Sequence, residues 1–239
     1  MTRDERRTQA RLDRLALGRK MARGKRNRRI GLALVALVVA AVAGFMLTRP
    51  SPTVAAPAEL LRRAEEASRI AGCSPVENVG PYQPESEDAA HISDPAQMPA
   101  LSTYPSVPPA SGPHNDVPLG AGVYDSPPPI DRVIHSLEHG AAVVWYSPDA
   151  AGEELEGLRA FYGGPNGARV IVAPHDYPAQ GEAGRLPAGT SMALVSWHNV
   201  ERCAQVSLAA AFDFSSQYSA PPFGQRSYLG EAPEAGADF

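Results

Sequence analysis

The sequence predicts an α+β fold: a small mixed sheet with flanking helices and a long Pro-rich wrapping segment, preceded by one transmembrane helix. Three observations lead to this prediction. Residues 30–47 contain no charged or polar side chain. Between residues 141 and 218, apolar runs typical of buried strands alternate with segments of helical periodicity. Residues 74–131 are rich in Pro, Ser and Asp and show neither pattern.

The apolar segment 30–47 has the length of a membrane span. Its eighteen residues would extend roughly 27 Å as a helix, which is close to the thickness of the bilayer hydrocarbon. The alternative is a cleaved signal peptide, for which Ala41-Val42-Ala43 offers a small-x-small site. The apolar run is longer than a typical signal region and the candidate cleavage site falls inside it, so a retained anchor is favoured.

Charge is distributed unevenly on the two sides of this segment. Residues 1–29 carry twelve Arg or Lys and three Asp or Glu. This excess predicts a basic cytoplasmic tail, and therefore a single-pass plasma-membrane protein with an extracytoplasmic C-terminal domain. The tail holds no aromatic residue for stacking on bases, so we expect it to contact the membrane surface and not nucleic acid. No particular protein partner is indicated.

Cys73 and Cys203 are the only cysteines, and both fall on the predicted outer side. An even pair in an oxidising compartment predicts one disulfide. Metal ligation by the two thiolates is the alternative, but the pair lacks a C-x-x-C spacing.

The first part of the outer region reads as a spacer followed by a domain. Residues 48–58 form a Pro/Ala spacer, and residues 59–220 are predicted to form the extracytoplasmic α+β domain. The domain begins with a helix over 59–72. Tyrosines scattered through 74–131 indicate that this irregular stretch wraps a core. A short helix is then expected over 131–140, with Asp131 as N-cap and Gly140 as its left-handed end.

The sequence of the second part of the domain predicts a strand–helix–strand unit. A strand over 141–146, a helix over 148–162 and a strand over 169–173 fit a right-handed crossover between parallel strands. A third strand is expected over 192–197 and a helix over 205–218. The loop 174–190 places His175-Asp176 on the solvated surface, and residues 221–239 are expected to form a C-terminal tail.

Two motifs carry the chemistry-bearing residues. The first is Ser111-Gly112-Pro113-His114, with Gly122-Val123-Tyr124 shortly after it, and the second is His135-Ser136-Leu137-Glu138-His139-Gly140. Together they resemble a bacterial membrane-anchored family described as domain of unknown function 3105. The resemblance covers roughly Cys73 to Tyr218 and extends to the layout of a basic N-terminus, one span and this domain. It implies little about activity.

The chain departs from the pattern of that family in three places. The family pattern has PPTSGPH and EHGG, whereas this chain has Pro108-Pro109-Ala110 before Ser111, and Gly140-Ala141. The third strand of the family tends to end in Trp-Gly, whereas here it ends in Trp197-His198. His198 is therefore not expected to be a shared site residue.

The histidines of the two motifs predict a metal site. His135 and His139 lie four residues apart on one helical face, which is how a helix presents two nitrogens to one ion. His114 would supply the third ligand, and Glu138 would orient a histidine or act as a general base. Zinc or copper is the expected ion, with sulfur from Met98 or Met192 as a further option for copper. The order of residues differs from the H-E-x-x-H zincin motif, which argues against a metalloprotease.

A second interpretation is a cell-surface interaction or assembly module in which the same histidines are structural. The sequence leaves both open, and it leaves open whether the site is catalytic. Several enzyme classes lack support, because no lysine follows residue 29. This absence removes a P-loop lysine, a Schiff-base lysine and a Ser-Lys dyad from the outer region.

Overall fold

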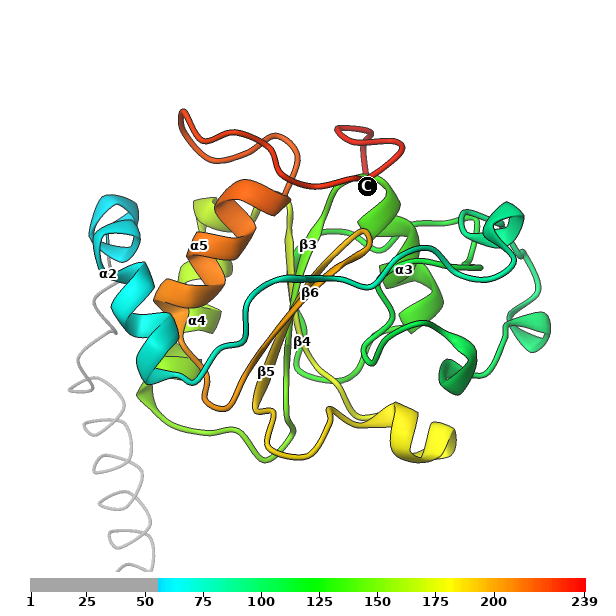
Figure 1. Ribbon diagram of the computed structural model, residues 1–239, viewed down its shortest axis with the longest axis horizontal. Coiled ribbons are helices and arrows are strands. Elements are labelled where there is room, and N and C mark those ends of the chain that lie inside the picture. The colour runs from blue at the N-terminus through cyan, green and yellow to red at the C-terminus, as the bar shows by residue number, and fades with distance from the viewer. Residues whose placement is uncertain (1–55) are drawn as a thin grey trace, which may run out of the picture. The chain divides into compact units, whose positions relative to one another are not determined.

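The computed structural model describes residues 56–239, and the predicted basic tail 1–29 and transmembrane helix 30–47 lie outside the described residues. From residue 56 onward, no helix is both long and apolar enough to cross a membrane. The described residues form a mixed α+β structure around one six-stranded sheet with the strand order β1-β6-β5-β3-β4-β2 (Figure 1).

The predicted crossover forms the centre of the sheet. β3 (Ala142–Tyr146) and β4 (Val170–Pro174) are parallel, and α4 (Glu153–Tyr162) connects them. The helix begins at Glu153 and not at 148, because Gly152 has a φ of 107°, which is outside the helical region. β5 (Met192–Ser196) lies antiparallel on the other side of β3.

Three strands were not predicted, and two of them form the edges of the sheet. β6 (Asn199–Cys203) pairs antiparallel with β5 after a turn at Trp197-His198. β1 (Glu77–Asn78) extends the sheet beyond β6, and β2 (Gly122–Val123) pairs parallel with β4 at the opposite edge. Two-residue strands and the polar β6 sequence carry too weak a periodic signal to be detected.

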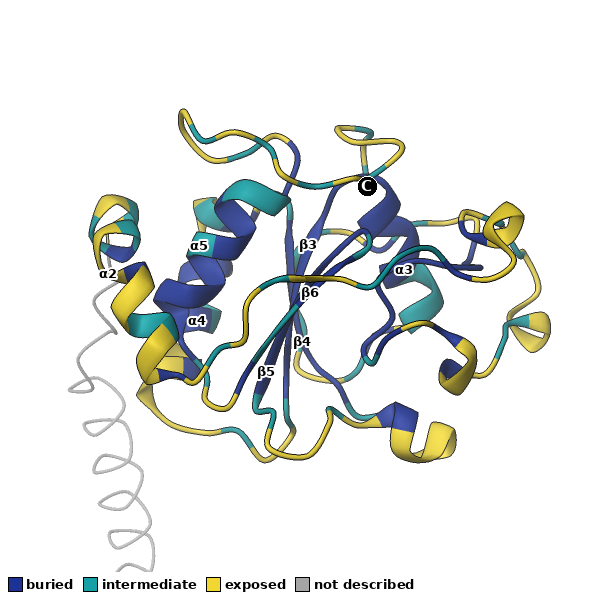
Figure 2. Ribbon diagram, viewed as in Figure 1, coloured by how far each residue is buried: buried dark blue, intermediate teal, exposed yellow. Residues whose placement is uncertain are grey.

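Both faces of the sheet are covered. α2 (Pro57–Ile70), α4 and α5 (Leu208–Tyr218) lie on one side, and α3 (Ile130–Glu138) and the irregular segment lie on the other (Figure 1). Successive strand residues alternate between the two cores: Val144, Val172 and Leu194 face the three helices, whereas Val143, Ile171 and Val195 face α3. Because both faces are buried (Figure 2), the central strands have continuous apolar sequences.

The segment before α3 wraps the α3 side of the sheet, as predicted. Tyr82 and Tyr104 are buried there, with ring centroids 5.4 Å apart. Short 3₁₀ turns at Glu85–Glu87, Pro95–Gln97 and Leu101–Thr103 are its only helical structure.

The helix that carries the second motif differs from the prediction at its start. Asp131 is not its N-cap: the cap is Pro129, whose carbonyl accepts the N–H groups of Arg132 and Val133. The proline already has a φ of −56°, close to helical values, so the helix begins at Ile130. At the other end, Gly140 has a φ of +87°, in agreement with the predicted left-handed position.

The predicted disulfide is present. Cys73 follows α2, Cys203 ends β6, and the bond links positions 130 residues apart. It joins the start of the domain to the sheet, and a loop closure of this length stabilises a fold by about 2–5 kcal/mol.

Candidate metal centre

The two sequence motifs meet at the C-terminal end of α3. His114 is fully buried, and its ring centroid lies 5.0 Å from that of His135. The rings of His135 and His139 are 4.6 Å apart, edge to face. His135 thus lies beside both of the other histidines predicted as metal ligands, but no single group of ligand atoms contains all three.

The SGPH motif holds His114 in place through its other residues. The Ser111 hydroxyl donates to Asp88 Oδ1 at 2.6 Å, and the Tyr104 hydroxyl donates to the Pro113 carbonyl at 2.6 Å. Gly112 has a φ of +116°, and a Cβ at this position would lie 2.8 Å from the Tyr104 ring. The motif requires glycine there because both the backbone conformation and the space exclude a side chain.

A fourth histidine, His91, joins the cluster although no motif marks it. The backbone of residues 90–92 runs alongside His114: the His114 N–H donates to the Ala90 carbonyl at 2.9 Å, and the Ile92 N–H donates to the His114 carbonyl at 2.7 Å. This pairing places the His91 ring 4.8 Å from both His114 and His135. The side chain of His91 is 44% exposed, so it lies at the solvent side of the cluster.

Glu138 is in contact with two of these histidines, His114 and His91. Its Oε2 lies 3.0 Å from His114 Nε2 and 3.2 Å from His91 Nε2, and its side chain is 5% exposed. Burial alone would raise the pKa of Glu138, but the hydrogen bonds with His114 and His91 outweigh it and hold the pKa below the usual glutamate value. The carboxylate is therefore ionised at neutral pH.

Each of the three predicted histidines is oriented by a backbone carbonyl. His114 Nδ1 lies 2.8 Å from the Gly112 oxygen, His135 Nδ1 2.7 Å from the Asn115 oxygen, and His139 Nδ1 2.7 Å from the Asp238 oxygen. A carbonyl only accepts, so each Nδ1 must carry the hydrogen. In a neutral imidazole, Nε2 is then the unprotonated nitrogen with a free lone pair.

These lone pairs point at one another and at carboxylates. His135 Nε2 and His139 Nε2 are 3.0 Å apart, and His114 Nε2 is 3.0 Å from Glu138 Oε2. Two acceptors at such distances repel unless a proton or a cation lies between them. Burial, followed by the neighbouring histidines, lowers the pKa of His135 despite its bond to Asn115, which disfavours protonation of that ring.

Around the histidines, the potential ligand atoms divide into two groups in which all atoms lie within 4.8 Å of one another. The first consists of His91, His114, His135 and Glu138, and the second of Glu138, His139 and Glu234. His139 thus falls in a different group from His114, and Glu234 comes from the segment predicted as a tail. Sequence reasoning identified neither His91 nor Glu234, since their positions depend on contacts between distant segments.

The remaining histidines lie outside these groups. His175 is fully buried against Trp145 and Tyr177, and not on the solvated surface as predicted. Burial lowers its pKa to about 4, so the ring is neutral. His198 lies outside the cluster and pairs with Asp88, with His198 Nε2 and Asp88 Oδ2 2.7 Å apart. Its φ of 62° lies in the left-handed region that glycine adopts most readily.

Sulfur atoms are not part of either group. Cys73 and Cys203 are joined to each other, which leaves no thiolate for a metal. Met192 belongs to the core on the opposite face of the sheet, and Met98 lines a separate cavity beside Leu101 and Tyr104. The ligands that the cluster offers are imidazole nitrogen and carboxylate oxygen.

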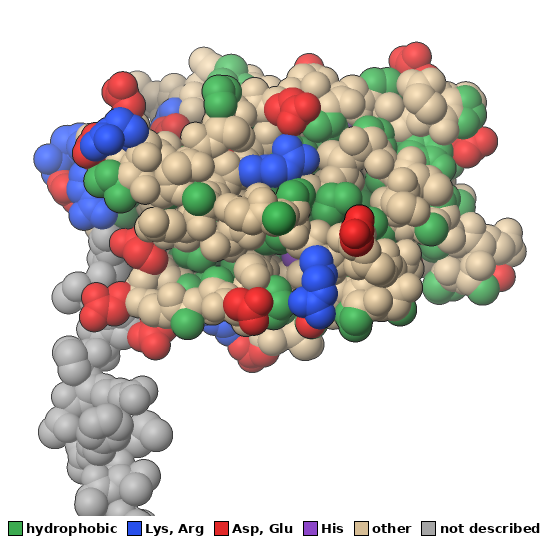
Figure 3. Space-filling model, turned by 60° about the horizontal axis from the view of Figure 1, so that its bottom comes forward, with side chains coloured by type: hydrophobic (Ala, Val, Ile, Leu, Met, Phe, Trp, Pro, Cys, Tyr) green, Lys and Arg blue, Asp and Glu red, His purple; other side chains and the backbone are tan. Residues whose placement is uncertain are grey.

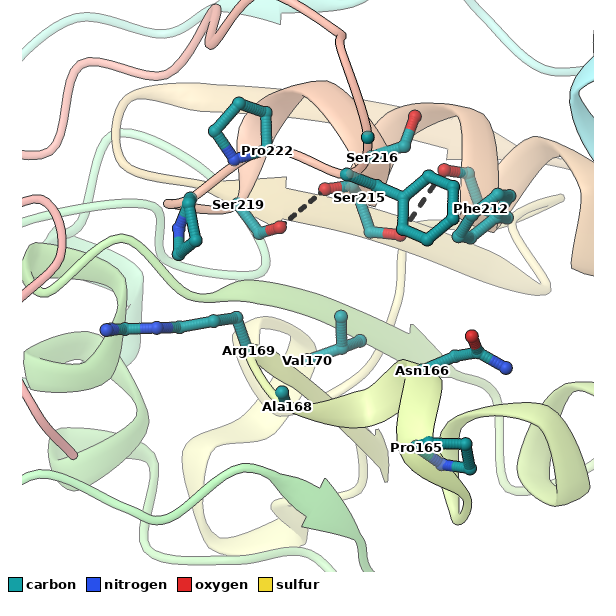
Figure 4. A pocket seen from close by; sticks show the side chains of 13 residues that line it. Pro165, Asn166, Ala168, Arg169, Val170, Phe212, Ser215, Ser216, Ser219 and Pro222 are labelled. Atoms are coloured by element: carbon teal, nitrogen blue, oxygen red, sulfur yellow. Dashed lines mark hydrogen bonds between the residues drawn. The ribbon is translucent and has the colours of Figure 1, made fainter.

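A cavity of about 330 Å³ lies between the end of α5 and residues 165–170, away from the lone pairs described above (Figure 4). Its serine hydroxyls are already bonded within the helix: Ser219 donates to the Ser215 carbonyl at 2.7 Å and Ser216 to the Asp213 carbonyl at 2.8 Å. The Arg169 side chain points away from the other cavity residues, and its guanidinium donates to the carbonyls of Gly236 and Ala237 (Figure 4). On the surface shown in Figure 3, acidic and basic side chains are scattered and little histidine is visible. The histidine cluster is thus the stronger candidate site.

Comparison with known proteins identifies the family. Comparisons with curated proteins and with solved structures find no match to this chain. The model of one family, described as protein of unknown function (DUF3105), matches residues 96–228, which include both motifs and more than half of the chain. The chain belongs to this family.

Proposed function

We propose that this protein binds a divalent transition-metal ion, zinc or copper, at the site formed by His91, His114, His135 and Glu138. The observation that carries the proposal is the orientation of the imidazoles. The Nδ1 atoms of His114 and His135 are bonded to backbone carbonyls, which leaves both Nε2 lone pairs available. His114 Nε2 lies 3.0 Å from the ionised Glu138 carboxylate, and the ligand atoms of His135 and Glu138 lie within 4.8 Å of each other. Metal-ligating histidines are oriented in this way, through a hydrogen bond from the second ring nitrogen.

The types of ligand favour zinc and copper over other ions. Imidazole is a ligand of intermediate softness that suits both metals, whereas magnesium and calcium prefer all-oxygen sites. One carboxylate leaves a net positive charge on a divalent ion, which can be balanced by a bound water that ionises or by an anion. His91 is the most exposed member of the group, and we assign the route of metal entry to its side of the cluster.

The proposed location is the outer side of the plasma membrane. The basic tail 1–29 and the apolar segment 30–47 support a single-pass anchor with this domain outside. The disulfide between Cys73 and Cys203 supports an oxidising compartment. At such a site, the protein would bind metal from the extracytoplasmic pool.

Metal uptake by the full-length chain tests the proposal. The protein is purified in detergent without a histidine tag, stripped with a chelator, loaded with Zn²⁺ or Cu²⁺ and separated from free metal before elemental analysis. We expect retention of metal by the wild type and a loss of affinity of at least about 10–100-fold for Glu138→Gln or His114→Gln. His198→Gly is the matched control, because it removes a histidine outside both ligand groups at a position where glycine fits the backbone.

The competing function, an interaction module with structural histidines, makes the opposite prediction. In that case protons fill the cluster, as imidazolium–carboxylate pairs between His114 and Glu138 and between His139 and Glu234. Absence of metal uptake by the wild type at micromolar supply, or equal uptake by wild type and Glu138→Gln, would overturn the proposed function.

A further inference from the structure

The second group of ligand atoms lies directly beside the first. Glu138 belongs to both groups, and His139 Nε2 is 3.0 Å from His135 Nε2 and 3.2 Å from Glu234 Oε2. A zinc or copper ion holds its ligands at about 2 Å, so the ligands of one ion lie at most about 4 Å apart. One ion therefore accounts for one group, and His139 and Glu234 remain as a pair of facing acceptors.

We propose that Glu138 bridges two metal positions and that His139 and Glu234 complete the second one. This inference rests on the proposed function, because the bridging carboxylate is the one assigned to the first ion. Two ions that share a carboxylate lie about 3.5–4 Å apart, a spacing that suits two adjacent groups with one common member.

The backbone around Glu234 is fixed to the end of α3. The Glu234 N–H donates to the Glu138 carbonyl at 3.1 Å, and the Gly236 N–H donates to the His139 carbonyl at 3.1 Å. In the opposite direction, His139 Nδ1–H donates to the Asp238 carbonyl at 2.7 Å. The C-terminal segment and the end of the helix thus hold the two carboxylates and the imidazole in one place.

Arg169 and Gly140 support this arrangement. The Arg169 guanidinium donates to the carbonyls of Gly236 and Ala237, at 3.0 and 2.5 Å, and lies 5.0 Å from the centroid of the Phe239 ring. At Gly140, a Cβ would lie 2.7 Å from the Ala220 Cβ and 3.4 Å from the Ala235 Cα. The glycine that ends the second motif therefore allows the C-terminal segment to approach the site.

Electrostatics favours a cation in the second position. Glu138 and Glu234 contribute two carboxylates, and the C-terminal end of α3 adds the partial negative charge of the helix dipole. Each position has one ligand open to solvent: the Glu234 side chain is 53% exposed and that of His91 is 44% exposed.

The test counts metal ions in three full-length proteins after saturation with Zn²⁺ and removal of free metal. We expect about two ions per chain in the wild type and about one in Glu234→Gln, as for other two-metal sites that lose a ligand of one ion. Glu231→Gln is the matched control: it lies in the same segment, its side chain is 49% exposed, and it belongs to neither group. It should keep the wild-type stoichiometry.

Copper provides a second readout. Two Cu²⁺ ions joined by Glu138 should show spin coupling in electron paramagnetic resonance, and Glu234→Gln should convert the spectrum to that of a single uncoupled ion.

One ion in both wild type and Glu234→Gln would overturn the second position but leave the proposed function standing. Two ions in both proteins, or loss of every ion in Glu234→Gln, would also overturn the second metal position. No metal in the wild type would overturn both proposals.

Discussion

The two faces of the sheet are built differently. The face covered by α2, α4 and α5 holds an apolar core, with Leu158, Phe161 and Phe212 packed on the strands. The face covered by α3 and the irregular segment buries several ionisable groups, namely Asp88, His114, His135 and Glu138. Regular helices satisfy their own backbone, whereas an irregular segment brings carbonyls that can orient histidines. The difference indicates that one face stabilises the domain, whereas the other carries the candidate site.

The largest expected effect is a loss of stability caused by a substitution on the face of the sheet that α2, α4 and α5 cover. Phe161→Ala removes a fully buried ring beside Tyr162 and Phe212 and should lower the free energy of unfolding by about 3–5 kcal/mol. Urea unfolding measures this change. Metal retention under native conditions should stay at the wild-type level. A Phe161→Ala protein that remains folded but loses its metal would contradict the separation of the two faces.

The next effect in size is stabilisation by metal. At a free metal concentration 100 times the dissociation constant, binding should raise the free energy of unfolding of the wild type by about 2.7 kcal/mol. Phe161→Ala should gain the same amount, because its site is intact. Glu138→Gln should gain little. Thermal melts with and without Zn²⁺ check this, and equal gains in all three proteins would show that the metal binds elsewhere.

A smaller effect is expected at Gly140, where the end of α3 meets the C-terminal segment. Gly140→Ala places a Cβ 2.7 Å from Ala220 at a φ of +87°, which should cost about 1–3 kcal/mol. Hydrogen exchange should show faster exchange of the amides of Glu234 and Gly236. Gly152→Ala is a useful control, since it also has a positive φ but nothing within 4 Å of its Cβ. Exchange at Glu234 should be unchanged in that variant.

The smallest effect is a pH dependence from the pair formed by His198 and Asp88. Burial opposes charge on both, but their mutual hydrogen bond and the nearby Glu231 raise the pKa of His198, while bonds from His198, Ser111 and Tyr82 lower that of Asp88. The stabilisation is fully present between about pH 4 and 6.5, the unfolded values of the two groups. It is lost as the pH rises through the raised pKa of His198 or falls through the lowered pKa of Asp88.

Urea unfolding of wild type and His198→Gly at several pH values measures this contribution. The difference in the free energy of unfolding should be larger near pH 5.5 than near pH 8.5. A difference that grows toward alkaline pH would have the wrong sign for a raised histidine pKa.

The centre of the fold was predictable from sequence, but β1, β2 and β6 were not. β3, α4 and β4 were expected because continuous apolar runs flank a helical repeat, and both features persist when the elements pack. β6 was missed because Asn199, Glu201 and Arg202 interrupt the apolar pattern. The position of His175 was wrong because a histidine in a Gly- and Pro-rich loop usually lies at the surface, whereas here it packs against Trp145.

The candidate site was predictable only where a motif fixed the spacing. His135 and His139 share a helix, so their proximity follows from local geometry. The approach of His114 was expected from the two motifs together. His91 reaches the cluster through backbone pairing with residue 114, and Glu234 through the end of α3. No periodicity or spacing in the sequence encodes either contact.

The most direct test of the central claim is anomalous diffraction from crystals of the full-length protein loaded with Zn²⁺. The account predicts a peak about 2.0–2.2 Å from the Nε2 atoms of His114 and His135 and from a carboxylate oxygen of Glu138. A second peak beside His139 and Glu234 would correspond to the second metal position. Anomalous peaks confined to other residues, with hydrogen-bonded imidazoles and no density between His114 and Glu138, would contradict the metal centre.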